Sequence, residues 1–289
     1  LIKSSAYDLV YIEVYSGLAF IWAEVCIWFL HSLRKTVFLV LHGGGLAEFA
    51  QKHPHRVKRL LQSAQQVITP SLFLQQALCK YRSDIQYLPN GLDLSNYPYG
   101  QQRQTHPKLI WLRALHKIYQ PELAVQVLAI LKPEFPDIQL QMVGPDKQDG
   151  SRQIMEQTAF SLGVENALSW IGPVPKSDVP RILSQGGIFL NTTCYESFGV
   201  SVMEAAACGL PIVTTDAGEL ALLWQNGHDA MVVPKGDAHA MAAAVRRVLT
   251  EPGLAEKLSV NARRKAEGFD WAVILPQWEK LFVAEMKNV

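Results

Sequence analysis

The sequence has almost no net charge and no long apolar run, and each absence excludes a class of protein. Its 27 Lys and Arg residues balance 26 Asp and Glu residues, giving a formal net charge of +1. Because nucleic-acid-binding domains usually carry a basic excess, we expect no nucleic acid partner. The most apolar stretch, residues 17–30, is shorter than the ~20 residues that cross a bilayer and contains Glu24, so we interpret it as a buried helix.

Cysteine is also scarce. The four cysteines, Cys26, Cys79, Cys194 and Cys208, lie far apart and form no C-x-x-C pair. Their spacing indicates neither a zinc site nor a disulfide framework. A reducing compartment fits best, and the sequence shows no signal peptide, so we expect a cytoplasmic protein. The chain begins at Leu1 in place of a start Met, and we expect that a further segment precedes it.

One local excess of positive charge comprises His53, His55, Arg56, Lys58 and Arg59. Two interpretations stay open. The run is a solvated helix face, which is the usual place for Lys and Arg, or it is a contact for anionic lipid or phosphate. The second interpretation predicts a peripheral contact with a membrane.

Apolar runs of strand length alternate with helix-length segments, which is typical of βαβ units and a parallel sheet. The expected strands cover residues 8–14, 36–41, 66–68, 85–88, 108–112, 139–143, 168–171, 187–190, 211–214 and 230–233. Pro121 fits the first turn of one helix, and Asp237 is expected to cap another.

A chain of 289 residues has room for two domains. Residues 90–107 are rich in Asn, Gly, Gln and Pro and interrupt the alternation, so we place an interdomain linker there. This predicts an N-terminal domain over residues 1–90 and a second domain over residues 91–269. Residues 270–289 form an expected helix that packs back on the first domain. Its predicted apolar face comprises Trp271, Ile274, Leu275, Trp278 and Leu281.

In doubly wound sheets, ligands bind beyond the carboxyl ends of the strands, so the loops that follow strands carry the functional candidates. One such loop reads HGGG, residues 42–45. The other, residues 191–213, reads NTTCYESFGVSVMEAAACGLPIV and enters a helix near Val200. Unpaired amides and the positive end of the helix dipole there favour a phosphate.

Two carboxylates flank this helix start. Glu196 precedes the helix, and Glu204 lies roughly one turn inside it. Carboxylates are poor phosphate ligands but good acceptors for sugar hydroxyls, so one could hold a transferred sugar and the other a ribose. The alternative makes both of them ordinary acids that complement the helix dipole.

The segment ESFGVSVMEAAACGLPIV, residues 196–213, resembles the signature of glycosyltransferase family 4 along its whole length. Further fragments resemble that family in the same order along the chain: HGGG at 42–45, ITPS at 68–71, LPNGLDLS at 88–95, LIWLRAL at 109–115, QLQMVGPD at 139–146 and WIGPV at 170–174. The resemblance implies an α/β GT-B fold, with two Rossmann-like domains facing a cleft and an incomplete first domain.

The resemblance also implies roles for individual residues around the helix start. Glu196 contacts the donor sugar and Glu204 the ribose hydroxyls. The backbone of a four-residue turn, Ser197, Phe198, Gly199 and Val200, binds the diphosphate.

Arg113 and Lys117 are the expected diphosphate cations, because a guanidinium can bind a diphosphate in bidentate fashion. The family usually has Gly-Arg followed by Lys-Gly, whereas this chain has Leu112-Arg113 and then HKIYQP, with Lys117 one position early. Either Lys117 still reaches the phosphates or Arg113 acts alone. A surface position for Arg113 is the alternative.

The resemblance places His42 near the donor sugar, whereas a lone histidine is more often structural. Gly43 and Gly44 would let the backbone approach the sugar or phosphate closely, unless they form only a flexible turn. Gly144 is expected at the edge of the nucleotide pocket and Val174 beside the nucleotide base, although both also fit plain strand-to-helix turns.

Two other enzyme classes fail on their motifs. The HGGG loop also occurs in α/β-hydrolases, but the G-x-S-x-G elbow that they need is absent. A dinucleotide oxidoreductase needs G-x-G-x-x-G, whereas residues 43–48 read GGGLAE.

The resemblance implies transfer of a hexose or similar sugar from a nucleoside-diphosphate-sugar donor, with retention at the anomeric carbon. The acceptor would be a hydroxyl of a glycan, a lipid-linked molecule or a small molecule. No cofactor is expected, and no metal, because the D-x-D pattern is absent. A truncated or degenerate GT-B protein that binds nucleotide sugar without efficient turnover stays open as the alternative.

Overall fold

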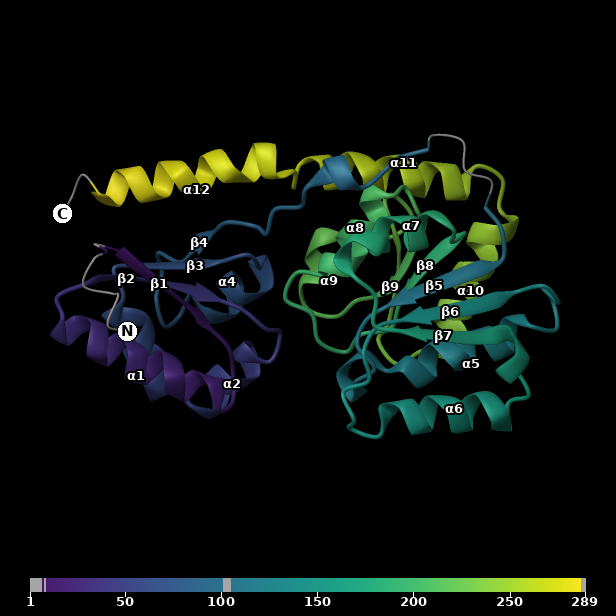
Figure 1. The fold of residues 1–289 in the computed structure, drawn as a ribbon, viewed down its shortest axis with the longest axis horizontal. Coiled ribbons are helices and arrows are strands. Elements are labelled where there is room, and N and C mark those ends of the chain that lie inside the picture. Colours follow the sequence, from purple (N-terminus) through teal and green to yellow (C-terminus); the bar gives the residue numbers. More distant parts are fainter. Residues whose placement is uncertain (1–6, 8, 101–104, 287–289) are drawn as a thin grey trace. The chain divides into compact units, whose positions relative to one another are not determined.

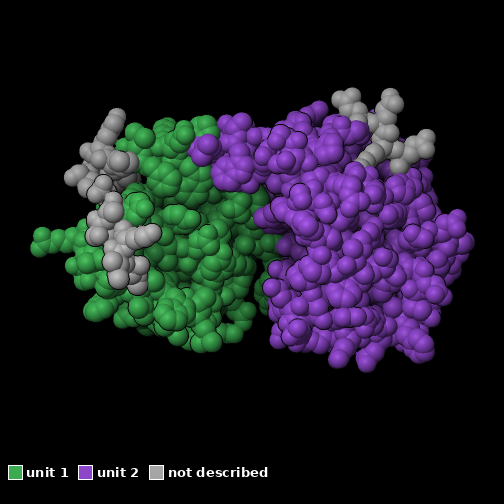
Figure 2. Space-filling view, in the orientation of Figure 1, with its two compact units in different colours: residues 1–90, 195–198, 276–289 green, residues 91–194, 199–275 purple. Residues whose placement is uncertain are grey.

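The computed structural model describes residue 7, residues 9–100 and residues 105–286. The chain divides into two compact units, coloured separately in Figure 2. Unit 1 comprises Leu1–Asn90, Tyr195–Phe198 and Pro276–Val289, and unit 2 comprises Gly91–Cys194 and Gly199–Leu275. Of the expected linker, residues 101–104 lie outside the described part of the chain.

Unit 1 contains a parallel sheet with strand order β1-β2-β3-β4 (Figure 1). Its strands are β1 (Leu9–Val14), β2 (Thr36–Leu41), β3 (Gln66–Thr69) and β4 (Gln86–Tyr87). Its helices include α1 (Ala19–Ser32), α2 (Leu46–Lys52), α3 (Pro54–Ser63) and α4 (Leu72–Leu78). Within the described residues β1 pairs with β2 alone, so it is an edge strand.

The interpretation of residues 17–30 as a buried helix is only partly correct, because α1 is buried on one side and exposed on the other. Phe20, Ala23 and Ile27 of α1 are buried in the unit 1 core. The side of the helix that carries Trp22 and Trp28 is solvent-exposed, and these residues are 71% and 73% exposed. A helix that is apolar all round gives no periodic signal to separate the two sides.

The last helix, α12 (Trp271–Met286), contributes Trp278, Leu281 and Phe282 to a second apolar cluster of unit 1, around Phe38 and Ile68. The predicted single apolar face is only partly correct. Ile274 is buried, but Leu275 and Trp271 are exposed over more than two fifths of their surface. Trp271 instead lies against Gly91, where an added Cβ would come within 2.5 Å of its ring.

Unit 2 contains a six-stranded parallel sheet of order β10-β9-β8-β5-β6-β7 (Figure 1). Its strands are β5 (Lys108–Leu112), β6 (Gln139–Val143), β7 (Leu168–Gly172), β8 (Ile188–Asn191), β9 (Ile212–Thr215) and β10 (Met231–Val233). Its helices are α5 (Pro121–Leu131), α6 (Ser151–Ser161), α7 (Val179–Ser184), α8 (Val200–Ala207), α9 (Glu219–Leu223), α10 (Ala238–Thr250) and α11 (Leu254–Glu267). The chain adds β6 and β7 on one side of β5, then β8 to β10 on the other. The loops that leave β5 and β8 therefore diverge at a topological switch point, where ligands bind in such sheets.

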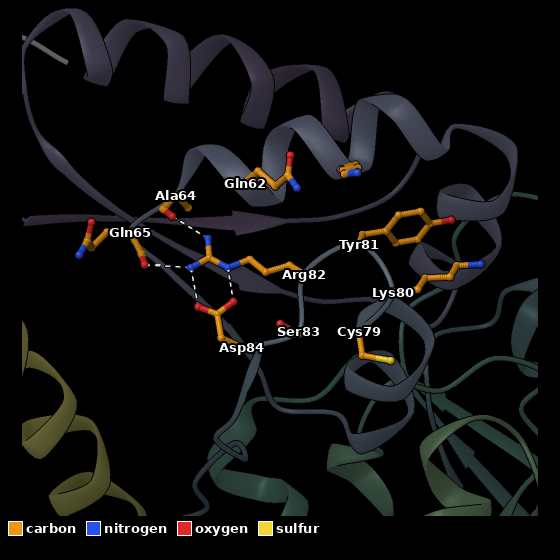
Figure 3. A pocket seen from close by; sticks show the side chains of 10 residues that line it. Gln62, Ala64, Gln65, Cys79, Lys80, Tyr81, Arg82, Ser83 and Asp84 are labelled. Atoms are coloured by element: carbon orange, nitrogen blue, oxygen red, sulfur yellow. Dashed lines mark hydrogen bonds and ion pairs between the residues drawn. The ribbon is translucent and has the colours of Figure 1, made fainter.

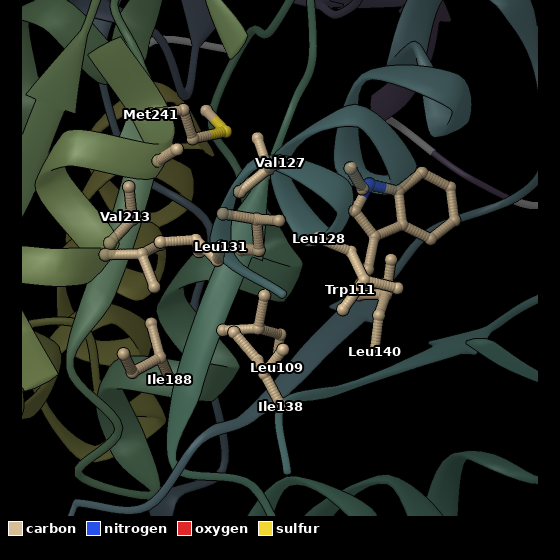
Figure 4. Packing of buried hydrophobic residues seen from close by; sticks show 14 of the residues in the cluster. Leu109, Trp111, Val127, Leu128, Leu131, Ile138, Leu140, Ile188, Val213 and Met241 are labelled. Atoms are coloured by element: carbon tan, nitrogen blue, oxygen red, sulfur yellow. The ribbon is translucent and has the colours of Figure 1, made fainter. Parts of the chain in front are cut away.

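The core of unit 2 packs the sheet against α5 and α10 (Figure 4). Trp111 on β5 is fully buried, and Leu128 and Leu131 of α5 belong to the same cluster. The side chain of Asp237 accepts a hydrogen bond from the Ala240 amide, which confirms the predicted cap of α10.

Every strand expected from the sequence is present, and its ends shift by at most one residue, with Asp8 outside the described part of the chain. Buried parallel strands read as nearly continuous apolar runs, which explains why these segments stand out.

Candidate functional site

The loop after β5 carries Arg113, and its position is fixed by buried polar contacts. The Arg113 amide donates to the Val143 carbonyl at 3.0 Å, and the guanidinium lies 4.9 Å from the centre of the Tyr119 ring. The Tyr119 carbonyl accepts a hydrogen bond from Thr192 Oγ1 at 2.5 Å. Trp111 Nε1 donates to the same hydroxyl at 2.8 Å, so the ends of β5 and β8 are tied together at the switch point.

Lys117 lies in the same loop, and its backbone is held while its side chain is exposed. The Lys117 amide donates to Asp149 Oδ2 at 2.9 Å. Hydrogen bonding from Ser151, followed by the bond from Lys117, lowers the pKa of Asp149 to about 2. The structure therefore puts Arg113 and Lys117 on one braced loop.

Gly144 draws the ends of three strands together. Its φ is 142°, and a Cβ at this position would lie 1.8 Å from the Arg113 carbonyl oxygen. The Gly144 amide donates to the Gly172 carbonyl at 2.9 Å, and the Gly144 carbonyl accepts from Trp170 Nε1 at 3.1 Å. Val174 is half-buried in the loop that follows Gly172.

Helix α8 begins without a capping side chain and with no acidic residue in its first turn. Gly199 takes the N-cap position with a φ of 89°. Ser201 is 7% exposed, and within the described part of the chain its hydroxyl has no hydrogen-bond partner. Ser201 and Glu204 are three residues apart, so they share one face of α8.

Glu204 is buried, and two side chains from separate loops hold one of its oxygens. Tyr97 Oη donates to Glu204 Oε1 at 2.6 Å, and Lys176 Nζ forms an ion pair with the same oxygen. Burial, reinforced by the Glu204 carboxylate, raises the pKa of Tyr97. Sequence reasoning missed both partners. Their only signal is position, because Tyr97 follows LPNGLDLS and Lys176 follows WIGPV.

Glu196 bonds to the turn that it precedes. Its Oε1 accepts from the Ser197 amide at 3.1 Å and from the Phe198 amide at 3.3 Å. Two of the four predicted diphosphate amides thus donate to Glu196 in this structure. The Gly199 and Val200 amides, in contrast, donate in none of the hydrogen bonds described.

His42 directly follows β2, and its amide donates to the Val14 carbonyl at 2.9 Å. Its ring stacks on Tyr15 with centroids 5.4 Å apart. Burial lowers the pKa of His42, and the nearby Glu13 carboxylate opposes that shift.

The rest of the HGGG loop lies against the segment that carries Glu196, and both belong to unit 1. Gly43 has a φ of 84°. A Cβ at Gly44 would lie 3.0 Å from the Glu196 amide nitrogen, so the two loops touch backbone to backbone.

A polar hollow of about 610 Å³ on unit 1 contains none of the predicted site residues (Figure 3). Arg82 dominates it, donating to the carbonyls of Leu61 at 2.7 Å and Ala64 at 2.6 Å. The same guanidinium pairs with Asp84 at 2.7 Å. Arg82 therefore joins the end of α3 to the segment before β4, which is a structural role.

Two further observations bear on the chemistry. Within the described ranges, no group of three or more His, Cys, Asp or Glu side chains is arranged to hold a metal ion. Nor does any helix in those ranges have the length and apolarity to cross a membrane.

Residues 100–265, more than half of the chain, match the family model described as glycosyl transferases group 1. The chain belongs to the group 1 glycosyltransferase family. The matched region contains Arg113, Gly144, Glu196 and Glu204, whereas the His42 loop lies outside it.

Curated relatives include two named enzymes. The chain is 25% identical over 257 residues to a glycogen synthase of Mycobacterium tuberculosis, covering 86% of this chain and 61% of the relative. It is 25% identical over 233 residues to a D-inositol 3-phosphate glycosyltransferase of Corynebacterium glutamicum, covering 74% of this chain and 56% of the relative. The chain therefore spans less than two thirds of the length of these relatives.

Solved structures agree with this family in fold. A sucrose-phosphate synthase from Thermosynechococcus elongatus superimposes with a TM-score of 0.82 at 21% identity, covering 98% of this chain and 75% of that chain. Anabaena HepE in complex with UDP and glucose superimposes with a TM-score of 0.85 at 20% identity, covering 98% of this chain and 80% of that chain. Likeness at this level of identity establishes the fold, which is GT-B.

Proposed function

We propose that this group 1 glycosyltransferase chain is a retaining enzyme of family 4 that transfers a hexose-type sugar from a nucleoside-diphosphate donor to a hydroxyl acceptor. The observation that carries the proposal is the start of α8, where no side chain among the described residues caps the amides or bonds the Ser201 hydroxyl, one turn from Glu204. Amides at a helix start favour phosphate, and a buried carboxylate favours sugar hydroxyls. The Anabaena HepE structures contain UDP and UDP-glucose, which supports a nucleotide sugar as the substrate.

In this proposal the residues of unit 2 bind the nucleotide. The Gly199 and Val200 amides, with Arg113 and Lys117, bind the diphosphate and stabilise the charge that it gains as its bond to the sugar breaks. Glu204 accepts from the ribose. Gly144 and the loop of Val174 line the nucleotide pocket.

The residues of unit 1 act on the sugar. Glu196 and His42 contact the donor sugar, and the Gly43-Gly44 backbone lies close to it. In transfer, the bond between the anomeric carbon and the diphosphate oxygen breaks, and the acceptor hydroxyl oxygen bonds to that carbon from the same face. The hydroxyl proton passes to the departing diphosphate, and no metal is required.

A second candidate function is nucleotide-sugar binding without efficient turnover. The Oε1 atom of Glu196 already accepts two amides of its own turn, and a sugar hydroxyl would have to compete with them or use Oε2. Turnover assays separate the two functions, because a binding protein would show donor affinity without acceptor-dependent release of nucleoside diphosphate.

For the acceptor, we infer that unit 1 docks on an anionic bilayer through α1 and α3, which would give access to a lipid-linked hydroxyl. Trp22 and Trp28 are exposed on α1, and a groove of about 630 Å³ lined by Trp28 and Arg59 runs between the helices. Lys58 and Arg59 are exposed on α3, and Arg59, which lies 3.7 Å from Glu24, lines the groove together with Trp28. Tryptophan favours the bilayer interface and cations favour anionic headgroups.

The test of donor binding is calorimetry of the chain with UDP, ADP and GDP. We expect at least one to bind at micromolar to submillimolar concentration, with weaker binding of the matching nucleoside monophosphate. A folded sample that binds none of them at millimolar concentration would refute the proposed function.

A further inference from the structure

The Glu204 carboxylate in unit 2 is held asymmetrically. Both of its described partners, Tyr97 Oη and Lys176 Nζ, lie on Oε1. Among the described contacts none involves Oε2. Because a carboxylate oxygen accepts about two hydrogen bonds, Oε1 is filled and Oε2 is the atom that remains for a ligand.

The two partners differ in how firmly they are placed. Tyr97 is buried, and Arg263 Nη1 donates to its carbonyl at 3.2 Å and to the Ala207 carbonyl at 2.5 Å. Arg263 therefore ties the Tyr97 segment to the end of α8, and Tyr97 is a fixed donor. Lys176 begins a short 3₁₀ helix (Lys176–Asp178) after β7, and its side chain is 66% exposed, against 4% for Glu204.

Lys176 Nζ is a hydrogen-bond donor, and it lies beside the Glu204 carboxylate, whose Oε2 is a hydrogen-bond acceptor. Lys176 can donate three hydrogen bonds and Glu204 takes one of them, so the others point to a neighbouring group or to solvent. Each hydroxyl of a vicinal diol can donate and accept. One hydroxyl can therefore donate to Oε2 while the next accepts from Lys176 Nζ.

We propose that Lys176 is a second ribose-binding residue: its Nζ donates to the 2′-hydroxyl of the donor nucleotide while Glu204 Oε2 accepts from the 3′-hydroxyl, so that Lys176 selects ribonucleotides over 2′-deoxyribonucleotides. The inference rests on the proposed function, because it needs a nucleotide whose ribose lies at Glu204. A site built to bond a hydroxyl discriminates against the analogue that lacks it, because the buried polar groups are left unpaired.

Two other roles for Lys176 predict different results. If its charge acts on the diphosphate, its removal weakens ribonucleotides and deoxyribonucleotides equally. If the ion pair with Glu204 takes no part in ligand binding, removal of Lys176 changes neither affinity.

The experiment measures the affinity of UDP and 2′-deoxy-UDP for the wild type and for Lys176→Met, Lys176→Arg and Lys117→Met. If ADP or GDP binds more tightly than UDP, that base and its 2′-deoxy form are used. We expect the wild type to prefer the ribonucleotide by about tenfold or more, as hydroxyl-reading sites do. Lys176→Met should reduce the preference to below about threefold, mainly through weaker ribonucleotide binding, and Lys176→Arg should retain it in part because a donor remains.

Lys117→Met is the matched control, because it removes an exposed cation from another loop of the same unit. It should weaken both nucleotides by the same factor and leave the preference unchanged. Unfolding midpoints of all variants are measured alongside, because Lys176→Met removes a partner of the buried Glu204 carboxylate, and affinities are compared only at temperatures where each variant is folded.

The outcomes separate the inference from the function on which it rests. If the wild type binds no nucleoside diphosphate, the proposed function fails. If the wild type binds but shows no ribose preference, or if Lys176→Met keeps the preference or lowers both affinities equally, the role of Lys176 is overturned while donor binding stands.

Discussion

Arg113 and Gly144 touch through their backbones: a Cβ on residue 144 would lie 1.8 Å from the Arg113 carbonyl oxygen. Gly144 also has a φ of 142°, a conformation that residues with a side chain rarely adopt. The position of the predicted diphosphate-binding arginine thus depends on the absence of a side chain on the residue that follows the neighbouring strand β6.

We therefore expect Gly144→Ala to lower the free energy of unfolding by about 2–4 kcal/mol, through strain and displacement of the Arg113 loop. Nucleotide affinity should fall as well. Gly150→Ala is the control, because Gly150 has a φ of 89° but nothing within 4 Å of an added Cβ, and it should cost only about 1–2 kcal/mol. Urea unfolding of both variants measures the difference, and equal losses would contradict the steric argument.

Removal of the Ser201 hydroxyl should act oppositely on stability and on binding. Because this buried hydroxyl has no partner among the described residues, Ser201→Ala should leave stability unchanged or raise it. Nucleoside diphosphate affinity should fall by about 0.5–1.5 kcal/mol if a phosphate oxygen is its partner. In the control, Ser259→Ala breaks a 2.6 Å bond to the Gly209 carbonyl, so stability should drop with no change in affinity. Unchanged nucleotide binding by Ser201→Ala would remove Ser201 from the site.

Substitution of Glu204 and of Glu196 should have different effects on the affinity for UDP and for the UDP-sugar. Glu204→Gln should weaken UDP by about 1.5–3 kcal/mol, because a charge-assisted bond to the ribose is lost. Glu196→Gln should leave UDP affinity nearly unchanged and reduce the affinity for the UDP-sugar and the rate of transfer. Calorimetry with both ligands checks this pattern. The roles would have to be exchanged if Glu196→Gln weakened UDP as much as Glu204→Gln did.

His42 should make stability depend on pH below neutrality. Burial lowers its pKa in the folded chain, so between the folded and unfolded values the unfolded state binds more protons, and stability decreases as the pH falls from about 6.5. His42→Gln should remove part of this slope. Urea unfolding at pH 7.5 and at pH 5.5 provides the measurement, with His239→Gln on unit 2 as the matched substitution. Identical slopes for the wild type and His42→Gln would show that His42 does not contribute to the pH dependence of stability.

The bilayer contact predicts binding to vesicles of phosphatidylglycerol, but not of phosphatidylcholine, at low salt. Trp22→Ser with Trp28→Ser should abolish sedimentation with the vesicles, and Arg59→Gln should weaken it by about 1 kcal/mol. Phe160→Ser on α6, a residue that is 77% exposed, is the control and should have no effect. Dimerisation that the tryptophan changes abolish, without vesicle binding, would assign this face to a second copy of the chain.

The fold could be predicted from the sequence where burial on both sides of a strand, or a local hydrogen bond, sets the sequence pattern. Fully buried parallel strands such as β2 and β8 appear as unbroken apolar runs, and Asp237 marks its helix by a local hydrogen bond. The exposed side of α1 could not be read, because its sequence is apolar on both sides.

The candidate site could be predicted from the sequence only where it depends on local structure. The helix start at Val200 is a local feature and lies where predicted. The bond from Tyr97 to Glu204 joins residues 107 positions apart, and that from Lys176 joins residues 28 apart, so only the folded chain brings these groups together.

The face of α8 that carries Ser201 and Glu204 fixes the separation between two ligand-binding side chains. At about 1.5 Å of rise per residue, the two side chains are offset by roughly 4.5 Å along the helix axis. In the proposed function, a ligand that contacts both side chains must carry a phosphate and a ribose diol at the matching distance. A free nucleoside diphosphate meets this requirement as well as the intact donor does. The spent nucleotide would keep its contacts on α8 after the sugar has left, and its departure would then set the pace of each turnover.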